Sequence, residues 1–315
     1  MGGVLCAGNV LVDILTRPVP EIRWDATMWV EDVVQGLGGN GGSTSFSIAR
    51  AGARVRLMGL TGRDPFGDYC RRTLEGAGVD LSLLGYANEA TSCSVVLVRP
   101  DGARALLHRP GAGREAFPEP LRFEAEMVDG CEHFHLANPF GLPLLRSHAG
   151  ETLRNARQAG LTTSLDTGWD ARGEWMTVAG PCFEHLDLLF VNRDEARMLA
   201  GTEDPDRAGA FFRDRGARVV VVKLGARGCL VLGPAGRFES PAFDVPVVDT
   251  TGAGDTFAGA FLAATQHGAG LEEAADYANA AGALSIQAMG GTAGVLARDR
   301  TLEWMRGARR RGAMC

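Results

Sequence analysis

One segment, residues 248–261, combines residue types that could hold an anion. Gly252, Ala253 and Gly254 follow an apolar, strand-like run and begin a segment rich in Ala, Phe and Leu. The first backbone N–H groups of a helix have no partner within the helix, and small residues let a ligand approach them closely. The sequence therefore predicts an anion site at this turn.

Asp255 follows this turn directly, although a carboxylate would ordinarily repel an anion. The placement makes chemical sense if Asp255 accepts the proton of an attacking hydroxyl while the adjacent N–H groups hold the oxygens of a transferring phosphoryl group. The alternative is that Asp255 is a first-turn acid, which the helix dipole stabilises without any catalytic role. The turn alone leaves both interpretations open.

Composition limits the function classes that need to be considered. The chain has 315 residues, 45% of them hydrophobic, and a formal net charge of −6; its pI is about 5.6. A chain of this size can bury a large core as one α/β unit, with or without an appendage. An acidic chain with scattered arginines predicts no binding to nucleic acids or membranes and favours a small-molecule substrate.

The cysteines and the hydrophobic segments indicate the compartment. The seven cysteines are widely spaced and include no C-x-x-C pair, a pattern typical of reduced thiols rather than of a disulfide framework or a zinc site. No uninterrupted apolar stretch is long enough to span a bilayer, and the amino terminus lacks the features of a signal peptide. We therefore expect a cytoplasmic protein.

Near the amino terminus, a carboxylate stands among apolar residues. The segment Val4–Ala7 is predicted to be a buried strand that ends at Gly8-Asn9, and Asp13 follows within an apolar run. An acid in such surroundings is either a satisfied structural carboxylate or a ligand for the hydroxyl groups of a polyol. We favour the ligand, because the motifs described below indicate a sugar.

A glycine-rich turn, residues 36–45, precedes a predicted helix. Three of its glycines formally satisfy the G-x-G-x-x-G pattern of a dinucleotide site, but no acidic residue follows at the spacing that a ribose requires. The absence of a G-K-[ST] triplet also excludes a Walker P-loop. The turn is instead predicted to expose its main chain to a polar ligand, with Asn40 and Ser43 offering hydrogen bonds.

Two segments outside the α/β pattern have strand character. Residues 91–98 and 103–108 alternate about the turn Pro100-Asp101-Gly102, which predicts a β-hairpin. Together with the polar and aromatic segment before the glycine-rich turn, this hairpin is predicted to form a small antiparallel sheet. This lid, residues 15–36 and 91–108, would cover a site on the main sheet.

From about Glu124 onward, buried strands alternate with helices. Such alternation is typical of a mostly parallel, doubly wound sheet with helices on both faces. We expect one α/β domain, residues 1–315, into which the lid is inserted. Strands are predicted at residues 133–136, 163–166, 188–191 and 219–224, and a helix at residues 151–159.

Four residues stand at the ends of predicted strands. Ligands of doubly wound sheets bind beyond the carboxyl ends of the strands, and Asn138, Asp166, Asn192 and Gly225 each occupy such an end. Any one of them could be a helix cap or a turn residue. Four in register favour a common crevice.

The glycine-rich turn and the segment around Asp255 together resemble the signatures of a known family. Residues 38–68 and 249–257 are similar to the paired motifs of the ribokinase-like (PfkB-type) carbohydrate kinases. Between them, Asn192-Arg193-Asp194-Glu195 resembles that family's N-x-x-E element, and residues 223–228 resemble its nucleotide-binding turn. Because the resemblance covers nearly the whole chain in the family's order, it favours the catalytic interpretation of Asp255.

The resemblance implies a kinase that transfers the γ-phosphoryl group of ATP to a sugar hydroxyl. Asp255 would be the general base, and the amides of residues 252–254 would form the anion hole. Asn192 and Glu195 would organise Mg²⁺ through its waters, since Mg²⁺ retains much of its hydration. The other implied contacts are Lys223, Gly225, Gly228 and Asn279 with the nucleotide; Asp13, Gly39, Asn40, Ser43, Asn138 and Asp166 with the sugar; and Asp249 and Thr251 with the K⁺ that relatives often bind.

Three positions depart from the family's pattern. Ser43 stands where many relatives have Asn, and Lys223 stands where several relatives have Thr. The acid that ribokinases carry at the end of the middle strand is absent from Ala137-Asn138-Pro139. Ser43 and the position of this missing acid would face the sugar, so the sequence leaves the acceptor open, and a nucleoside kinase of the same superfamily is one alternative. A catalytically silent protein that senses sugars or nucleotides is another, against which the intact Asp255 turn argues.

The predicted lid also bears on assembly. Alone, it would be a thin sheet with one apolar face exposed, and such small sheets are marginally stable. Two copies could bury these faces against each other. We therefore expect a homodimer formed through the lids rather than a monomer whose lid packs only on its own domain.

Overall fold

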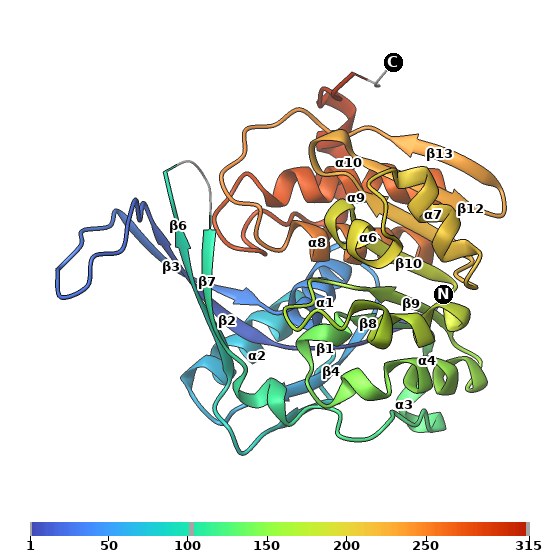
Figure 1. Ribbon diagram of the computed structural model, residues 1–315, viewed down its shortest axis with the longest axis horizontal. Helices are drawn as coiled ribbons and strands as arrows, with labels where there is room; N and C mark the ends of the chain where they lie inside the picture. The colour runs from blue at the N-terminus through green and yellow to red at the C-terminus, as the bar shows by residue number, and fades with distance from the viewer. Residues whose placement is uncertain (1, 101–103, 313–315) are drawn as a thin grey trace.

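A nine-stranded sheet forms the centre of the protein (Figure 1), and the computed structural model describes residues 2–100 and 104–312. In sheet order its strands are β13 (Gly236–Ser240), β12 (Cys229–Gly233), β11 (Val219–Lys223), β10 (Leu188–Asn192), β9 (Thr162–Asp166), β8 (Cys131–Ala137), β1 (Gly3–Gly8), β4 (Val55–Thr61) and β5 (Leu84–Tyr86). The pairs from β11 to β5 are parallel, whereas β12 and β13 extend one edge as antiparallel strands. The mostly parallel sheet predicted from the sequence is therefore confirmed.

Helices cover both faces of this sheet. One face carries α1 (Asn40–Arg50), α2 (Pro65–Ala77), α8 (Ala253–Gln266) and α9 (Leu271–Ser285), and the other carries α4 (Ala149–Gln158), α5 (Trp175–Ala179), α6 (Arg193–Ala200) and α7 (Pro205–Arg213). The short α3 (Ala125–Val128) joins the second layer, and α10 (Arg298–Gly307) packs on α9. Within the described residues, every helix is too short or too polar to cross a bilayer.

The sequence of β11 explains the two layers. Its four valines alternate between the faces, so that Val219 and Val221 lie in the core beneath α8 and α9, whereas Val220 and Val222 lie in the core beneath α4 to α7. All four are at most 8% exposed. A strand buried on both faces has to be apolar at every position, which is why a continuous apolar run indicates a parallel sheet.

A second, four-stranded sheet projects from one side of the main sheet (Figure 1) and forms the lid. Its strands, in order, are β3 (Asp32–Gly38), β2 (Leu11–Arg17), β6 (Ser92–Val98) and β7 (Arg104–Arg109). The outer pairs are antiparallel, but β2 and β6 pair in parallel. The prediction of an antiparallel lid is thus wrong for the central pair, because β4, α2 and β5 return the chain to the main sheet between two hairpins that leave it in the same direction.

The lid strands also differ from the predicted segments at their ends. Strand β2 begins at Leu11, so that Asp13 belongs to the lid, and residues 18–31 contain no strand. The predicted hairpin of β6 and β7 is confirmed. Its predicted turn residues Asp101 and Gly102 lie outside the described residues.

Two histidines are buried between β8 and β9. His133 Nδ1 lies 2.8 Å from the Thr162 hydroxyl and its Nε2 lies 2.6 Å from the Ser164 hydroxyl, which is also 2.7 Å from His135 Nδ1. Burial lowers the pKa of His133 to about 4. Burial, together with the nearby His133, also holds the pKa of His135 well below its ordinary value. Both rings are therefore neutral at pH 7.

This burial predicts a pH-dependent contribution to stability. A histidine whose pKa is lowered on folding stabilises the fold fully above its unfolded pKa of about 6.5, and progressively less as the pH falls toward about 4. Relative to His133→Gln, the native protein should lose about 3 kcal/mol of its unfolding free energy between about pH 7 and pH 4. Denaturant unfolding of both proteins across this range measures the difference, and a difference that does not change with pH would contradict the prediction.

Candidate active site

The anion-binding turn predicted from the sequence begins helix α8. Gly252 precedes the helix with a φ of 68°, and a Cβ added there would lie 2.8 Å from the Cα of Gly291, so glycine is required at this position. No side chain of the described structure caps α8. The N–H of Ala253 makes only a long bond of 3.3 Å to the preceding turn, and the N–H groups of Gly254 and Asp255 belong to the first turn, where helices offer them no partner.

A chain of asparagines holds the carboxylate of Asp255. Asn40 Nδ2 donates to Asp255 Oδ1 at 2.7 Å, and Asn138 Nδ2 donates to Asn40 Oδ1 at 2.8 Å. The backbone N–H of Asn40 donates to Asn9 Oδ1 at 2.9 Å. Gly39, with a φ of 83°, turns the chain into α1 directly before Asn40. The ends of β1 and β8 thus fix the side chain that orients Asp255.

The surroundings of Asp255 raise its pKa to about 7. Burial is the largest cause, and the negative charge of Asp166 adds to it, whereas the hydrogen bond from Asn40 and the charge of Lys223 act in the opposite direction. A carboxyl group with a pKa near neutrality can take a proton from a hydroxyl and release it again at physiological pH.

Lys223 forms a largely buried ion pair with Asp166 beside the start of α8. Its Nζ lies 2.9 and 2.7 Å from the two carboxylate oxygens and joins the ends of β11 and β9. Burial alone would lower the pKa of Lys223, but Asp166 and Glu195 outweigh this effect and raise the pKa. A Cβ at Gly254 would lie 3.2 Å from the ammonium group. Glycine at this position therefore leaves room between the helix start and Lys223.

The N-x-x-E element forms a capping box at the start of α6. Asn192 Oδ1 accepts from the N–H of Glu195 at 2.9 Å, while Glu195 Oε2 accepts from the N–H of Asn192 at 2.8 Å and from the Thr167 hydroxyl at 3.0 Å. Glu195 Oε1 accepts from Asn192 Nδ2 at 2.7 Å. Burial raises the pKa of Glu195 although Lys223 opposes it. Both carboxylate oxygens are thus occupied by hydrogen bonds.

Asp13 approaches the site from the lid. It is buried on β2, and a Cβ at Gly38 would lie 2.1 Å from its Oδ2, so glycine at that position makes room for the carboxylate. Burial raises the pKa of Asp13 to about 6, while a hydrogen bond with Ser94 lowers it. The charge of Asp13 also raises the pKa of Asp255. The two carboxylates therefore belong to one site.

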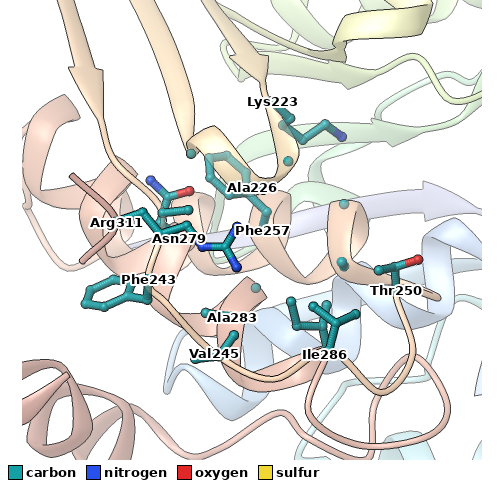
Figure 2. A pocket seen from close by; sticks show the side chains of 17 residues that line it. Lys223, Ala226, Phe243, Val245, Thr250, Phe257, Asn279, Ala283, Ile286 and Arg311 are labelled. Atoms are coloured by element: carbon teal, nitrogen blue, oxygen red, sulfur yellow. The ribbon is translucent and has the colours of Figure 1, made fainter. Parts of the chain in front are cut away.

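A cavity of about 330 Å³ extends from the start of α8 along α9. Figure 2 shows Lys223 and Thr250 at one end and Phe243, Asn279 and Arg311 at the other. Such a volume lies in the range of small-molecule sites. The cavity therefore extends from the anion-binding turn to an end lined by Phe243, Asn279 and Arg311.

Ser240 fixes two of the residues that line this cavity. Asn279 Nδ2 donates to the carbonyl and hydroxyl oxygens of Ser240 at 3.0 and 2.7 Å, so its amide oxygen is the group that it can offer to a ligand. Gly228 has a φ of 91°, and a Cβ there would lie 2.0 Å from the Ser240 carbonyl oxygen. Gly225, with a φ of 59°, and Gly228 thus form a turn whose backbone conformation favours glycine.

The loop before the anion-binding turn contacts the lid. Asp249 Oδ1 accepts from the N–H and hydroxyl of Thr251 at 2.9 and 2.8 Å, and its Oδ2 accepts from the N–H of Gly290 at 2.9 Å. Arg104 of β7 donates to the Thr251 hydroxyl at 2.7 Å, and its guanidinium lies 3.7 Å from Asp249 Oδ1. A positively charged group of the lid therefore already lies at this loop.

Comparisons with known proteins agree on one family. A model of the pfkB family of carbohydrate kinases matches residues 1–298. The chain belongs to the PfkB family of carbohydrate kinases. It is an ATP-dependent sugar kinase, as the sequence predicted.

Relatives of this PfkB kinase match it over most of their length. The ATP-dependent ribose-1-phosphate kinase of Halopiger xanaduensis is 33% identical over 285 residues, which cover 90% of this chain and 91% of the relative. The aminoimidazole riboside kinase of Salmonella typhimurium is 30% identical over 268 residues, 80% of this chain and 82% of the relative. The structure of Arabidopsis thaliana ribokinase with ribose and ATP superposes with a TM-score of 0.81 at 26% identity, covering 97% of this chain and 99% of that one.

The structure of the PfkB kinase brings most of the predicted residues together, with one exception. Ser43 is buried in the first turn of α1, and within the described part of the chain no hydrogen bond joins its hydroxyl to the site. The sequence analysis missed Asn9, Thr167 and Arg104. Asn9 follows a strand, which is the signal that identified Asn138, whereas Arg104 is marked by no local pattern.

The ion pair of Lys223 and Asp166 predicts that removing only one partner destabilises this PfkB kinase. Lys223→Met would leave Asp166 buried without its counter-charge, and the free energy of unfolding should fall by about 3–5 kcal/mol. The double variant with Asp166→Asn should regain most of that loss, because no uncompensated charge remains. Denaturant unfolding of the native protein, both single variants and the double variant measures this coupling. Losses that simply add would contradict it.

Proposed function

We propose that Asp255 is the general base that takes the proton from the acceptor hydroxyl, while the amides of Gly252, Ala253 and Gly254 form the hole for the phosphoryl oxygens. The observation that supports this most is that the Asp255 carboxylate and these N–H groups belong to the same helix turn. A hydroxyl bound to the carboxylate would therefore lie next to a phosphoryl group bound to the N–H groups. Asn40 orients the carboxylate, whose pKa of about 7 suits proton transfer. A first-turn acid that only stabilises the helix would need neither the hydrogen bond from Asn40 nor a raised pKa.

The acceptor is proposed to lie between the lid and the carboxyl ends of the strands. Asp13 would reach it from the lid, and Gly39, Asn40 and Asn138 from the main sheet, with amide and carboxylate groups that suit sugar hydroxyls. Asp166 is paired with Lys223, so its contact with the sugar would require this pair to separate. Ser43, buried in α1, is left with a packing role.

Both relatives compared above are named for ribose derivatives. We infer that the acceptor of this kinase is ribose or a ribose phosphate, and the amide groups of Asn40 and Asn138 suit the hydroxyl groups of such a sugar. A nucleoside kinase and a silent sensor are the alternatives. They differ in which molecule, if any, accepts the phosphoryl group.

A panel of acceptors tests this inference. ADP release from ATP would be measured with ribose, ribose 1-phosphate, a nucleoside, fructose and 2-dehydro-3-deoxygluconate. We expect kcat/KM for ribose or ribose 1-phosphate to exceed that of the other sugars by at least about tenfold, the effect of one missing polar contact. Turnover with the nucleoside alone would favour the nucleoside kinase, and ATP binding without any turnover would favour the sensor.

ATP is proposed to occupy the 330 Å³ cavity, with its phosphates at the end lined by Lys223 and Gly254. Lys223 supplies a positive charge there, and the turn of Gly225 and Gly228 lets the nucleotide approach the main chain. The amide oxygen of Asn279 would then face the ribose or the base. This orientation directs the terminal phosphate toward Asp255.

Mg²⁺ is expected to accompany ATP, with Asn192 and Glu195 acting on it through water. Among the described residues, no group of three or more His, Cys, Asp or Glu side chains could hold a metal ion, and both oxygens of Glu195 already accept hydrogen bonds. These residues therefore fit a hydrated ion held mainly by the phosphates. Mg²⁺ bound in this way would neutralise charge on the phosphoryl oxygens.

K⁺ fits the loop of Asp249 and Thr251 less well. The Asp249 carboxylate accepts hydrogen bonds at both oxygens, and the guanidinium of Arg104 lies against the same two residues. A cation at this loop would have to compete with Arg104. We therefore assign K⁺ no step in the proposed mechanism.

A cytoplasmic location is proposed as well. The six cysteines that the structure describes are free thiols, and Cys315 lies outside the described residues. A reducing compartment supports such thiols, and it also supplies ATP.

Substitution of Asp255 tests its proposed role. Asp255→Asn keeps the shape of the side chain but cannot accept the proton, so kcat should fall by about 10²–10⁴-fold while the Kd for ATP changes by less than about threefold. Asp68→Asn is a matched control, because Asp68 is an exposed first-turn acid of α2, and its kcat should not change. Single-turnover kinetics and calorimetry give the two quantities. Turnover of Asp255→Asn within a few-fold of the native protein would remove Asp255 from this role.

We propose a homodimer in which the lids of two copies pack against each other. The contact would be made by the outer face of the small sheet, which is the face opposite to Asp13. Strand register places Val33 and Leu97 in one row and Val95 and Leu107 in the next row of the same face. Val33 is 64% exposed and Leu107 is 62% exposed. An exposed apolar sheet face is a typical interaction surface, and a two-fold axis would bury it against its own copy.

Charges placed on this face should prevent assembly. The double variant Val33→Glu, Leu107→Glu would bring four carboxylates together in the dimer, and sedimentation equilibrium at micromolar concentration should give the mass of a monomer. Met198→Glu is the control, because Met198 is 40% exposed on α6, outside the lid, and this variant should remain a dimer. A native protein that sediments as a monomer would contradict the proposal.

A further inference from the structure

The carboxyl-terminal segment contributes to the nucleotide cavity although the family match ends before it. The matched residues end at 298, where helix α10 begins, and residues 308–312 follow that helix. Arg311 lines the cavity, and Figure 2 shows it between Asn279 and Phe243. This part of the chain is therefore a candidate source of nucleotide contacts beyond the shared motifs.

Backbone hydrogen bonds attach this segment to the wall of the cavity. The N–H of Arg311 donates to the carbonyl oxygen of Ala242 at 2.8 Å, and the N–H of Asp244 donates to that of Arg309 at 2.8 Å. The guanidinium of Arg310 lies 4.6 Å from the ring centroid of Phe243 and 2.8 Å from the Asp276 carboxylate of α9. These contacts hold residues 309–311 antiparallel to residues 242–244 and so define where Arg311 lies.

The side chain of Arg311 is oriented as well. Its Nε donates to Asp244 Oδ1 at 3.2 Å, which leaves the terminal nitrogens of the guanidinium for other partners. Around it the cavity is lined by apolar side chains, among them Phe243, Val245 and Ala283. A planar cation in an apolar slot can lie over an aromatic ring and donate hydrogen bonds to acceptors at its edge.

The two ends of the cavity suit different parts of a nucleotide. Lys223, next to the anion-binding turn, lies at the end of the cavity opposite to Arg311 (Figure 2), and a Cβ at Gly254 would lie 3.2 Å from its ammonium group. A nucleotide whose phosphates lie at that turn would extend its base toward Arg311. Guanidinium groups stack on nucleic-acid bases in the same way in proteins that bind single strands.

We propose that Arg311 binds the base of ATP, its guanidinium covering the purine ring while Asp244 holds it in place. This inference rests on the proposed function in one respect, that the cavity is the ATP site. Arg311 then adds nucleotide affinity without taking part in phosphoryl transfer. The segment after α10 is accordingly part of the nucleotide site.

Calorimetric binding of three probes tests this role. Arg311→Ala should raise the Kd for ATP and for adenosine by about tenfold, the effect of losing one cation–π contact and its hydrogen bonds. The Kd for tripolyphosphate, which has no base, should not change. Arg309→Ala is the matched control, since Arg309 is an exposed residue of the same segment that does not line the cavity, and it should bind all three probes as the native protein does.

Asp244→Asn provides a second variant if Arg311→Ala does not fold, because it frees the guanidinium without removing it. The Kd for ATP should then rise by about two- to fivefold. Native affinity for ATP in a folded Arg311→Ala protein would overturn the inference, and so would an equal loss for tripolyphosphate, which would make Arg311 a phosphate contact. A native protein that does not bind ATP would instead overturn the assignment of the cavity.

Discussion

The ammonium group of Lys223 balances the negative charge on which the site depends. Asp166, Glu195 and Asp255 lie near one another in partly or fully buried positions, and each would be costly to ionise without a nearby cation. Lys223 pairs directly with Asp166 and acts on the other two through its charge. Because it lies beside Gly254, the same group faces the space where phosphates are proposed to bind.

This balance of charges sets the pKa of Asp255 close to 7. Burial and Asp166 raise its pKa, whereas Asn40 and Lys223 lower it. A fully paired aspartate would be a weak base, and an unpaired buried one would remain protonated at pH 7. The intermediate value suits a group that has to take up a proton in each cycle and release it afterward.

The parallel sheet is what brings these groups together. Five neighbouring strands, β11, β10, β9, β8 and β1, end in Lys223, Asn192, Asp166, Asn138 and Asn9, the last two directly after the strand. Parallel strands present their carboxyl ends at one edge, so residues distant in the sequence meet there. The sequence predicted all five of these strand ends because a polar residue or glycine interrupts a continuous apolar run, but it did not single out Asn9 as a site residue.

Other features depend on contacts that no local pattern records. The parallel pairing of β2 with β6 follows from the path of the chain between the two hairpins, not from either strand. Arg104 meets Thr251, 147 positions away, and Arg311 meets Asp244, 67 positions away. Arginines are frequent on this chain's surface, so these two became identifiable only once the fold had placed Arg104 beside the buried Asp249 and Arg311 at the cavity.

The pH dependence of phosphoryl transfer tests the central role of Asp255 most directly. We expect kcat/KM for the acceptor, measured from about pH 5 to 9 at saturating ATP, to rise tenfold per pH unit up to a plateau. The midpoint should lie at the pKa of Asp255, about 7 in the free protein, or above it when the phosphates of ATP add negative charge. In Asn40→Ala, which lacks the hydrogen bond that lowers this pKa, the rise should move to higher pH. A native rate that does not change with pH from about 5 to 8 would contradict the assignment of Asp255 as the base.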